Sequence, residues 1–258
     1  MANKYHIYIP SKGRAHNCVT AKILQEDGLD FTIMVEPQDY KAYAEYFDKS
    51  VLFKMKKNDQ GIAYARNQAL ELSRKRKEKG HWQMDDDIRK FMERVDNKNV
   101  KVSPSKSVAA CEKTFDKYEN LGMIAHRYTS FAFAQKTKFG VNQNPCSSFL
   151  LRNDLEAEWH KGTVVDADFA LQVLHDGWTT LIANRELIDT IPPMKQAGGL
   201  TDSEYAGDGR FNRFTQLAQD WPGCFTVKRD KNGKAKLYHK RIWSSFTQRP
   251  IPVKARSR

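Results

Sequence analysis

Short β-rich runs and longer helical patterns alternate through the first hundred residues. Runs of apolar and β-branched residues, each ending at a polar loop, predict strands at 5–9, 31–35 and 51–55. Apolar residues at helical spacing predict helices at 15–25, 40–47 and 61–79. This alternation predicts an α/β fold whose twisted, mainly parallel sheet has helices on both faces.

The second half of the chain carries a mixed pattern. It predicts helices at 103–119 and 163–177, strands at 123–134 and 147–151, and a polar loop at 135–145. A later helix repeats apolar residues at helical spacing, which is more typical of a core than of a stacking surface: Phe211, Phe214, Leu217, Ala218 and Trp221. Finally, the runs 225–229 and 236–239 flank Asn232-Gly233, which predicts a β-hairpin.

The most unusual pattern is a short apolar strand that runs directly into Asp85, Asp86 and Asp87. Three adjacent carboxylates repel one another, and oxygen ligands favour a hard divalent ion such as Mg²⁺ or Mn²⁺. Alternate residues of an extended segment share a face, so Asp85 and Asp87 can converge on one ion while Asp86 points elsewhere. An acidic turn whose last aspartate caps the next helix is the alternative interpretation.

Other polar residues also follow predicted strands. In open α/β sheets, ligands bind at the carboxyl ends of the strands. The Ser11, Lys12 and Arg14 loop and Glu36 should therefore share one edge of the sheet with the acidic cluster. Arg66 lies near the start of its helix, where an anion bound at the helix end explains it, as does a surface salt bridge.

The length of 258 residues indicates one α/β domain with appendages. No stretch approaches the eighteen apolar residues of a membrane span, and the N-terminus lacks the apolar run of a signal peptide. We therefore expect a soluble, cytoplasmic protein with no membrane partner. The four cysteines form no C-x-x-C pair, so we expect them to be reduced and not part of a zinc knuckle.

The net charge of +12 is concentrated near the C-terminus, where eleven Lys and Arg residues after position 224 face only Asp230. Such a concentration indicates a polyanionic partner, most simply nucleic acid. A solvated hairpin and frayed tail are the alternative. The candidate nucleic-acid-binding residues are Lys228, Arg229, Lys234, Lys236, Lys240 and Arg241.

Three motifs in order carry a resemblance to a known family: Ile-Pro-Ser-Lys-Gly-Arg, Gly-Ile-Ala-Tyr-Ala-Arg-Asn and Met-Asp-Asp-Asp-Ile. Over about residues 5 to 200 the chain resembles the GT-A nucleotide-sugar glycosyltransferases, specifically the phage and TET-associated branch that decorates 5-hydroxymethylpyrimidines in DNA. The resemblance implies a metal-dependent, inverting transfer from a UDP-sugar to 5-hydroxymethylcytosine or a related base, or to a sugar already on it. A phage-encoded protein would work in the host cytoplasm.

The resemblance also implies roles for individual residues. Asp85 and Asp87 match the D-x-D motif that holds Mn²⁺ or Mg²⁺ against the donor diphosphate, and His239 is a candidate for the late histidine that completes the metal shell. A histidine among basic residues is otherwise a surface residue. The residues implied to line the donor pocket are Pro10, Ser11, Lys12, Arg14, Glu36, Arg66, Asp85 and Asp86.

Two aspartates at the start of the 163–177 helix match the acidic motif that supplies the catalytic base in inverting GT-A enzymes. Asp166 matches best and Asp168 second, although the family's usual Glu-Asp pair is Val165-Asp166 here. Acidic residues at a helix start also suit the helix dipole, so a structural role explains both.

The resemblance divides the chain into a glycosyltransferase domain at 1–224 and a basic hairpin and tail at 225–258. Residues 1–100 would be the donor half of that domain and 101–224 the acceptor half. The Gly-Gly stretch at 197–200 either closes over a substrate or simply connects, and the 135–145 loop either moves or contacts the acceptor. Two other functions stay open: a GT-A enzyme with a glycan, lipid-linked or protein acceptor, and a non-catalytic nucleic-acid-binding protein.

Overall fold

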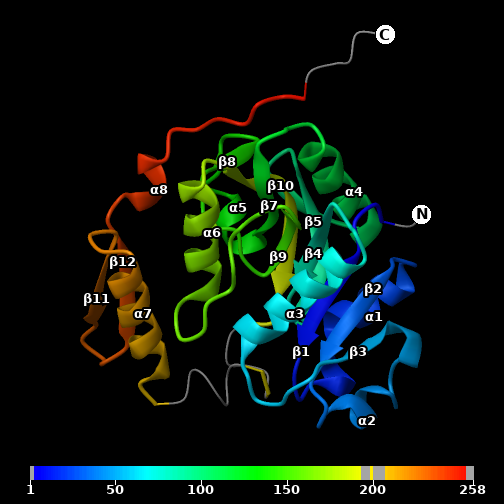
Figure 1. Cartoon of the computed structure of the whole chain (residues 1–258). Coiled ribbons are helices and arrows are strands. Elements are labelled where there is room, and N and C mark those ends of the chain that lie inside the picture. Colours follow the sequence, from blue (N-terminus) through cyan, green and yellow to red (C-terminus); the bar gives the residue numbers. More distant parts are fainter. Residues whose placement is uncertain (1–2, 193–197, 200–206, 254–258) are drawn as a thin grey trace.

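The structure, a computed structural model, describes residues 3–192, 198–199 and 207–253. It confirms the α/β fold class: helices flank a central ten-stranded sheet (Figure 1). The strand order is β3-β2-β1-β4-β9-β7-β10-β5-β6, with β8 paired to β10 beside this path.

The N-terminal half forms the parallel side of the sheet. Its strands are β1 (Ile7–Ser11), β2 (Phe31–Val35), β3 (Leu52–Lys54) and β4 (Gly80–Met84). They are linked by η1 (Ala15–Asn17), α1 (Val19–Glu26), α2 (Tyr40–Tyr43), η2 (Lys49–Val51) and α3 (Ile62–Lys75). These elements confirm the predicted alternation, although α2 is shorter than predicted and α3 ends before residue 79. Helices cover both faces of such strands, so their sequences read as continuous apolar runs.

Beyond β4 the sheet is mixed. β9 (Ser148–Arg152) runs antiparallel to both β4 and β7 (Leu121–Tyr128). The long β10 (Thr179–Thr190) is parallel to β7 and antiparallel to β8 (Phe139–Val141) and β5 (Ile88–Val95). The last strand, β6 (Lys98–Val102), pairs antiparallel with β5. Antiparallel neighbours need only short connections, whereas parallel neighbours need a crossover.

Two local predictions in this half are wrong. The strand predicted at 123–134 ends at Tyr128, where its pairing with β10 also ends, and a helical turn, α5 (Thr129–Ala132), follows. The loop predicted at 135–145 contains β8. Strands β5, β6 and β10 lacked a sequence signal because charged residues interrupt their apolar runs.

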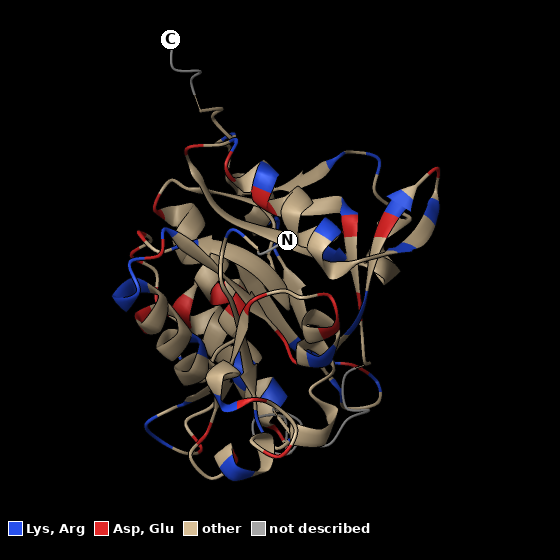
Figure 2. Cartoon of the chain, turned by 90° about the vertical axis from the view of Figure 1, so that its right-hand side faces the viewer, with Lys and Arg blue, Asp and Glu red and all other residues tan. Residues whose placement is uncertain are grey.

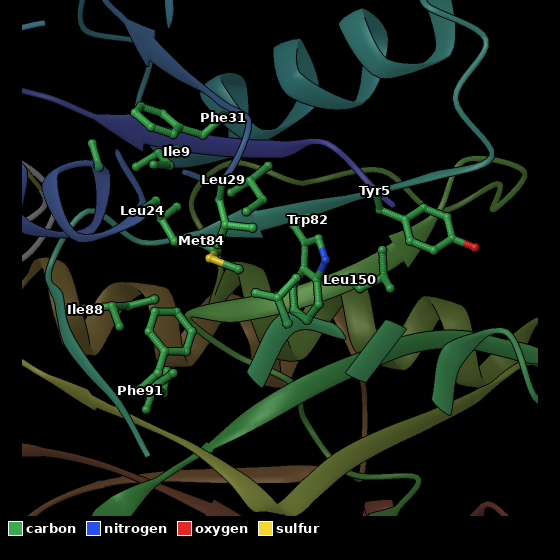
Figure 3. Packing of buried hydrophobic residues seen from close by; sticks show 14 of the residues in the cluster. Tyr5, Ile9, Leu24, Leu29, Phe31, Trp82, Met84, Ile88, Phe91 and Leu150 are labelled. Carbon is green, nitrogen blue, oxygen red and sulfur yellow. The ribbon is translucent and has the colours of Figure 1, made fainter. Parts of the chain in front are cut away.

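The core lies on both faces of the sheet. On one face, α1 and α4 (Pro104–Phe115) cover a cluster that includes Leu24, Trp82, Phe91 and Leu150 (Figure 3). On the other face, α3 and α6 (Val165–His175) cover a second cluster. The helices therefore hold β4 rigidly from both sides, and with it the acidic cluster at its carboxyl end.

The C-terminal segment packs beside α6 (Figure 1). It contains α7 (Gly209–Asp220), the predicted hairpin of β11 (Phe225–Arg229) and β12 (Ala235–His239), and α8 (Ile242–Ser245). Leu171 of α6, Leu217 of α7 and Phe225 share one buried cluster. After α8 the chain returns to the body, where the Asn142 amide donates to the carbonyls of Phe246 and Gln248 at 3.1 and 2.9 Å.

Charge is unevenly distributed over the molecule. On the side seen in Figure 2, basic and acidic segments are interspersed, whereas the hairpin sequence from Lys228 to Arg241 is predominantly basic. No helix in the described ranges is long and apolar enough to cross a membrane.

Candidate functional site

A cavity of about 440 Å³ opens at the carboxyl ends of the parallel strands. Each of β1, β2, β3 and β4 contributes the residues that follow it, and the starts of α3 and α6 complete the wall. The predicted site residues in this wall are Pro10, Ser11, Lys12, Arg14, Glu36, Arg66, Asp85, Asp86, Asp87 and Asp166. The prediction that the loop after β1, Glu36 and the acidic cluster share one edge is confirmed.

Asp86 ties the acidic cluster to the loop after β1. Its buried carboxylate accepts hydrogen bonds from Ser11 Oγ at 2.5 Å and Arg14 Nη1 at 2.6 Å. Ser11 Oγ is also 2.6 Å from the Tyr43 hydroxyl. The Asp86 carboxylate is therefore directed to Ser11 and Arg14, and it holds the cavity wall together. Residues 86–87 form a turn, so the alternation predicted for an extended segment does not continue through the cluster.

Asp85 and Asp87 line the cavity together with Asp86. The Asp85 carboxylate, 32% exposed, accepts from Arg66 Nη2 at 3.1 Å. Burial, and then the charges of Asp85 and Asp86, raise the pKa of Asp87 to about 7. Ionising Asp87 is therefore unfavourable in this cluster without additional positive charge nearby.

Arg66 bridges two of the predicted functional groups. It is 3% exposed, and its guanidinium bonds the carboxylate of Asp166 as well as that of Asp85. The guanidinium also lies over the Trp159 ring, 4.7 Å from its centroid. Burial lowers the pKa of Arg66, but the two carboxylates outweigh it and hold the pKa above its usual value. The surface salt bridge considered from the sequence is instead a bridge between a buried arginine and two partly buried carboxylates.

Asp166 faces the cavity from the first turn of α6. Burial raises its pKa, while Arg66 opposes the shift. A carboxylate with a raised pKa beside a cavity has the chemistry of a proton acceptor, because it can take a proton from a nearby hydroxyl.

Asp168 does not reach this cavity. It is 2% exposed and accepts from Trp221 Nε1 at 2.9 Å and Gln172 Nε2 at 2.9 Å, with His160 Nδ1 also at 2.9 Å. Residues two apart on a helix differ by about 200° in direction, so Asp166 and Asp168 cannot face the same space. The second-ranked base candidate is thus a structural partner of Trp221.

His239 is also placed away from the acidic cluster. It lies on β12 opposite Phe225, and its Nδ1 accepts from Trp243 Nε1 at 2.9 Å. Burial lowers the pKa of His239. The hairpin packs on α6 and α7, so its geometry does not bring this histidine to Asp85 and Asp87.

The two cations of the loop after β1, Lys12 and Arg14, are both paired with acids. Lys12 contacts Asp59 and lies 3.3 Å from the buried Glu36 carboxylate. Gly199 also lines the cavity, and Arg14 Nη2 donates to the Gly198 carbonyl at 3.1 Å. The rest of the predicted Gly-Gly stretch, Ala197 and Leu200, lies outside the described residues.

The basic hairpin presents its cations in two directions. Lys228 and Lys236 are exposed and directly opposite each other, on the face away from the buried cluster. Arg229 instead turns inward, donates to Asp208 at 2.8 Å and lies over the Phe211 ring. Lys234, Lys240 and Arg241 are exposed.

Several cavity residues were missed by the sequence analysis, notably Tyr128, Ser147, Lys161 and Arg213. Arg213 is 6% exposed, and its Nε donates to the Thr163 carbonyl at 2.8 Å. The sequence signal that could have identified Arg213 is its position within the apolar face of the α7 helix. An arginine that is buried with such a face needs a polar or charged partner inside the protein.

The model of the TET-Associated Glycosyltransferase family matches residues 5–199. No curated protein sequence matches the chain.

Two solved structures are similar to parts of the chain. A197 from STIV is 11% identical, with a TM-score of 0.39 over 69% of this chain and 80% of that one. GalNAc-T7 with UDP, GalNAc and Mn²⁺ is 10% identical, with a TM-score of 0.47 over 75% of this chain and 44% of that one.

Proposed function

This chain belongs to the TET-associated glycosyltransferase family and is a glycosyltransferase, and we propose that it transfers a sugar from a UDP-sugar to DNA. The acceptor is the hydroxymethyl group of a 5-hydroxymethylpyrimidine in the DNA, which we take to be 5-hydroxymethylcytosine. A hydroxyl of a sugar that is already attached to this base is the other form of the acceptor. The observation that carries this proposal is the cavity in which Arg66 joins Asp85 to Asp166, beside Asp87.

The proposed reaction is a displacement at the anomeric carbon of the sugar. The acceptor oxygen attacks that carbon and forms the new glycosidic bond, while the bond from the carbon to the diphosphate breaks and UDP leaves. Asp166 takes the proton of the acceptor hydroxyl, and attack opposite the leaving group inverts the anomeric centre. The raised pKa of this buried carboxyl supports the role of base.

Departure of UDP develops negative charge, which preorganised cations stabilise without proton transfer. Arg66 and Arg14 are held rigidly by their carboxylate partners at this edge. Pro10, Ser11 and Glu36 line the same end of the cavity, where we place the nucleoside of the donor.

The residues present fit a divalent metal. Asp85 and Asp87 offer hard oxygen ligands. Burial, and then the charges of Asp85 and Asp86, raise the pKa of Asp87, and a bound cation would favour its ionised form. In the described ranges no three His, Cys, Asp or Glu side chains form a complete metal-binding group. Two carboxylates are enough for Mg²⁺ or Mn²⁺, because proteins hold such an ion with one or two carboxylates while substrate phosphates and water fill the remaining positions. When bound, the metal would supply charge that stabilises the leaving diphosphate.

The basic hairpin supports a DNA acceptor. Lys228 and Lys236 are directly opposite on the outward face, and like charges in such a pair are unfavourable. Asp230 lies 3.8 Å from Lys236 and offsets part of this repulsion, and a further anion over the pair would offset the rest. Phosphates of the DNA backbone would serve as that anion. Duplex affinity should then fall with salt, with a log-log slope of roughly −0.9 per phosphate neutralised.

The test is UDP release with Mn²⁺ and a panel of UDP-sugars, measured with hydroxymethylated duplex DNA, unmodified DNA and no DNA. Release that requires both metal and modified DNA is the expected result, and it also names the sugar. UDP-sugar hydrolysis that is indifferent to DNA would move the acceptor to a glycan, lipid-linked or protein substrate. No release under any condition would favour a non-catalytic nucleic-acid-binding protein.

A further inference from the structure

Two exposed aromatic residues lie on a segment whose two ends meet at the cavity wall. Phe131 is 59% exposed and Phe133 76% exposed, the two highest fractions among large hydrophobic side chains of the described ranges. Exposing two phenyl rings to water is unfavourable, and neighbouring exposed rings of this kind mark a surface that binds something.

The segment from 129 to 146 leaves the cavity wall and returns to it. It starts after Tyr128 and ends before Ser147, both of which line the cavity. The hydroxyls of Tyr128 and Ser147 are hydrogen-bonded, which ties the two ends of the segment together. The Phe131 ring contacts the Tyr128 ring edge-on, 6.2 Å between centroids. Whatever binds Phe131 therefore lies beside the cavity.

The two rings project because the residue between them is anchored. Ala132 is fully buried, with 0% exposure, and its carbonyl accepts from the Gln135 backbone at 3.1 Å. The helical turn α5 is thus seated on the body of the protein, and the two phenylalanines project from either side of Ala132, because residues two apart on a helix differ by about 200° in direction. A fixed turn holds the rings in place before a ligand arrives, which lowers the entropic cost of binding.

The charge around these rings identifies the kind of ligand. No Asp or Glu occurs between residues 120 and 153, and Lys136 and Lys138 follow the rings and are exposed. Aromatic rings beside exposed cations are the combination by which proteins hold single-stranded nucleic acid, because bases stack on the rings and cations attract the phosphates.

We propose that Phe131 and Phe133 form a stacking platform, with one ring on each side of the turn, for unpaired bases of the acceptor strand next to the nucleotide that enters the cavity. The proposal rests on the proposed DNA acceptor and specifies how that acceptor is bound. The target strand is locally opened, so the hydroxymethyl group enters the cavity from an unstacked base and not from an intact major groove.

The test compares the affinity of the protein for a labelled single-stranded oligonucleotide and for its perfect duplex, by fluorescence anisotropy at fixed salt. We expect the wild-type protein to prefer the single strand. Phe131→Ala and Phe133→Ala should each weaken single-strand binding by about 5- to 150-fold. Phe131→Tyr and Phe133→Tyr, which keep the ring, should bind like the wild type, whereas Phe131→Leu should not.

Val100→Ala is the matched control, because Val100 is an exposed apolar residue, at 48%, on a different part of the molecule, β6. It should leave binding unchanged. Thermal unfolding of each variant verifies folding, which surface substitutions should not alter. Alanine variants that bind single strands as tightly as the wild type would overturn the platform, as would leucine variants that bind normally.

Sugar transfer to hydroxymethylated DNA, measured in parallel, separates the two proposals. Transfer by the wild type with unchanged binding by the phenylalanine variants would overturn the platform alone. A wild-type protein that neither binds nor glycosylates DNA would overturn the acceptor and the platform together. Sedimentation that shows a dimer lost in the Phe131→Ala, Phe133→Ala double variant would assign the rings to a second copy of the chain and also overturn the platform.

Discussion

Replacing each of the two α6 aspartates by asparagine should affect different properties of the enzyme. Asp166 lines the cavity, whereas Asp168 is directed to Trp221 and is 2% exposed. Asparagine has nearly the same size as aspartate but cannot accept a proton at neutral pH. Asp166→Asn should therefore remove the base, and it also leaves the buried Arg66 with Asp85 as its remaining described carboxylate partner. Asp168→Asn should weaken the fold and leave the chemistry.

The expected magnitudes follow from these contacts. Loss of a general base lowers kcat by about 10²- to 10⁴-fold, or roughly 3 to 5 kcal/mol in the activation barrier. Asp168→Asn keeps an oxygen for the Trp221 indole but loses the charge facing His160, which costs about 1 to 2 kcal/mol of unfolding free energy. For a chain of 258 residues that corresponds to a fall in Tm of about 2 to 4 °C.

The assay is UDP release at saturating donor and acceptor, with calorimetric unfolding of the same samples. Asp166→Asn should retain its donor Kd and lose kcat, and Asp168→Asn should keep kcat within about twofold of the wild type. A hundredfold loss of kcat in Asp168→Asn with normal kcat in Asp166→Asn would reverse the assignment. Equal activity in both variants would show that neither carboxylate is the base.

Three further outcomes follow from the described contacts. Glu112→Ala removes the carboxylate that accepts hydrogen bonds from the Trp82 indole and from the backbone amides of Lys4 and Tyr5. The free energy of unfolding, measured in urea, should therefore fall by roughly 2 to 5 kcal/mol. An unchanged unfolding midpoint would contradict this. Burial lowers the pKa values of His81 and His126 to about 3 from 6.5, so the unfolded chain binds more protons between these pH values. Stability should be fully present above pH 6.5 and fall below it by about 1.4 kcal/mol per pH unit for each histidine, a slope that urea titrations of wild type and His126→Gln would measure. Asp87→Asn should weaken Mn²⁺-dependent UDP binding, measured by calorimetry, at least about tenfold; unchanged metal and donor binding would exclude Asp87 as a ligand.

The amino-acid sequence alone determined the strand and helix alternation of the first hundred residues and the edge at which ligands bind. These features are local: the apolar run before Asp85 and the Pro, Gly and cation loop after β1 specify where a strand ends. Because ligands bind at the carboxyl ends of strands, sequence-adjacent signals were enough to gather Ser11, Glu36 and Asp85 at one cavity.

Only the tertiary structure decided how the groups at that edge are paired. The sequence ranks Asp166 before Asp168 only through the resemblance, and the rotation of α6 against the sheet is what directs them to different surroundings, because that rotation depends on packing with α3, β7 and α7. The bridge from Arg66 to Asp85 and Asp166 spans 19 and 100 residues, and the cavity position of Arg213 depends on how α7 docks beside α6. Periodicity specifies which face of an element is buried, but contacts between distant segments are set by packing, which no local pattern encodes.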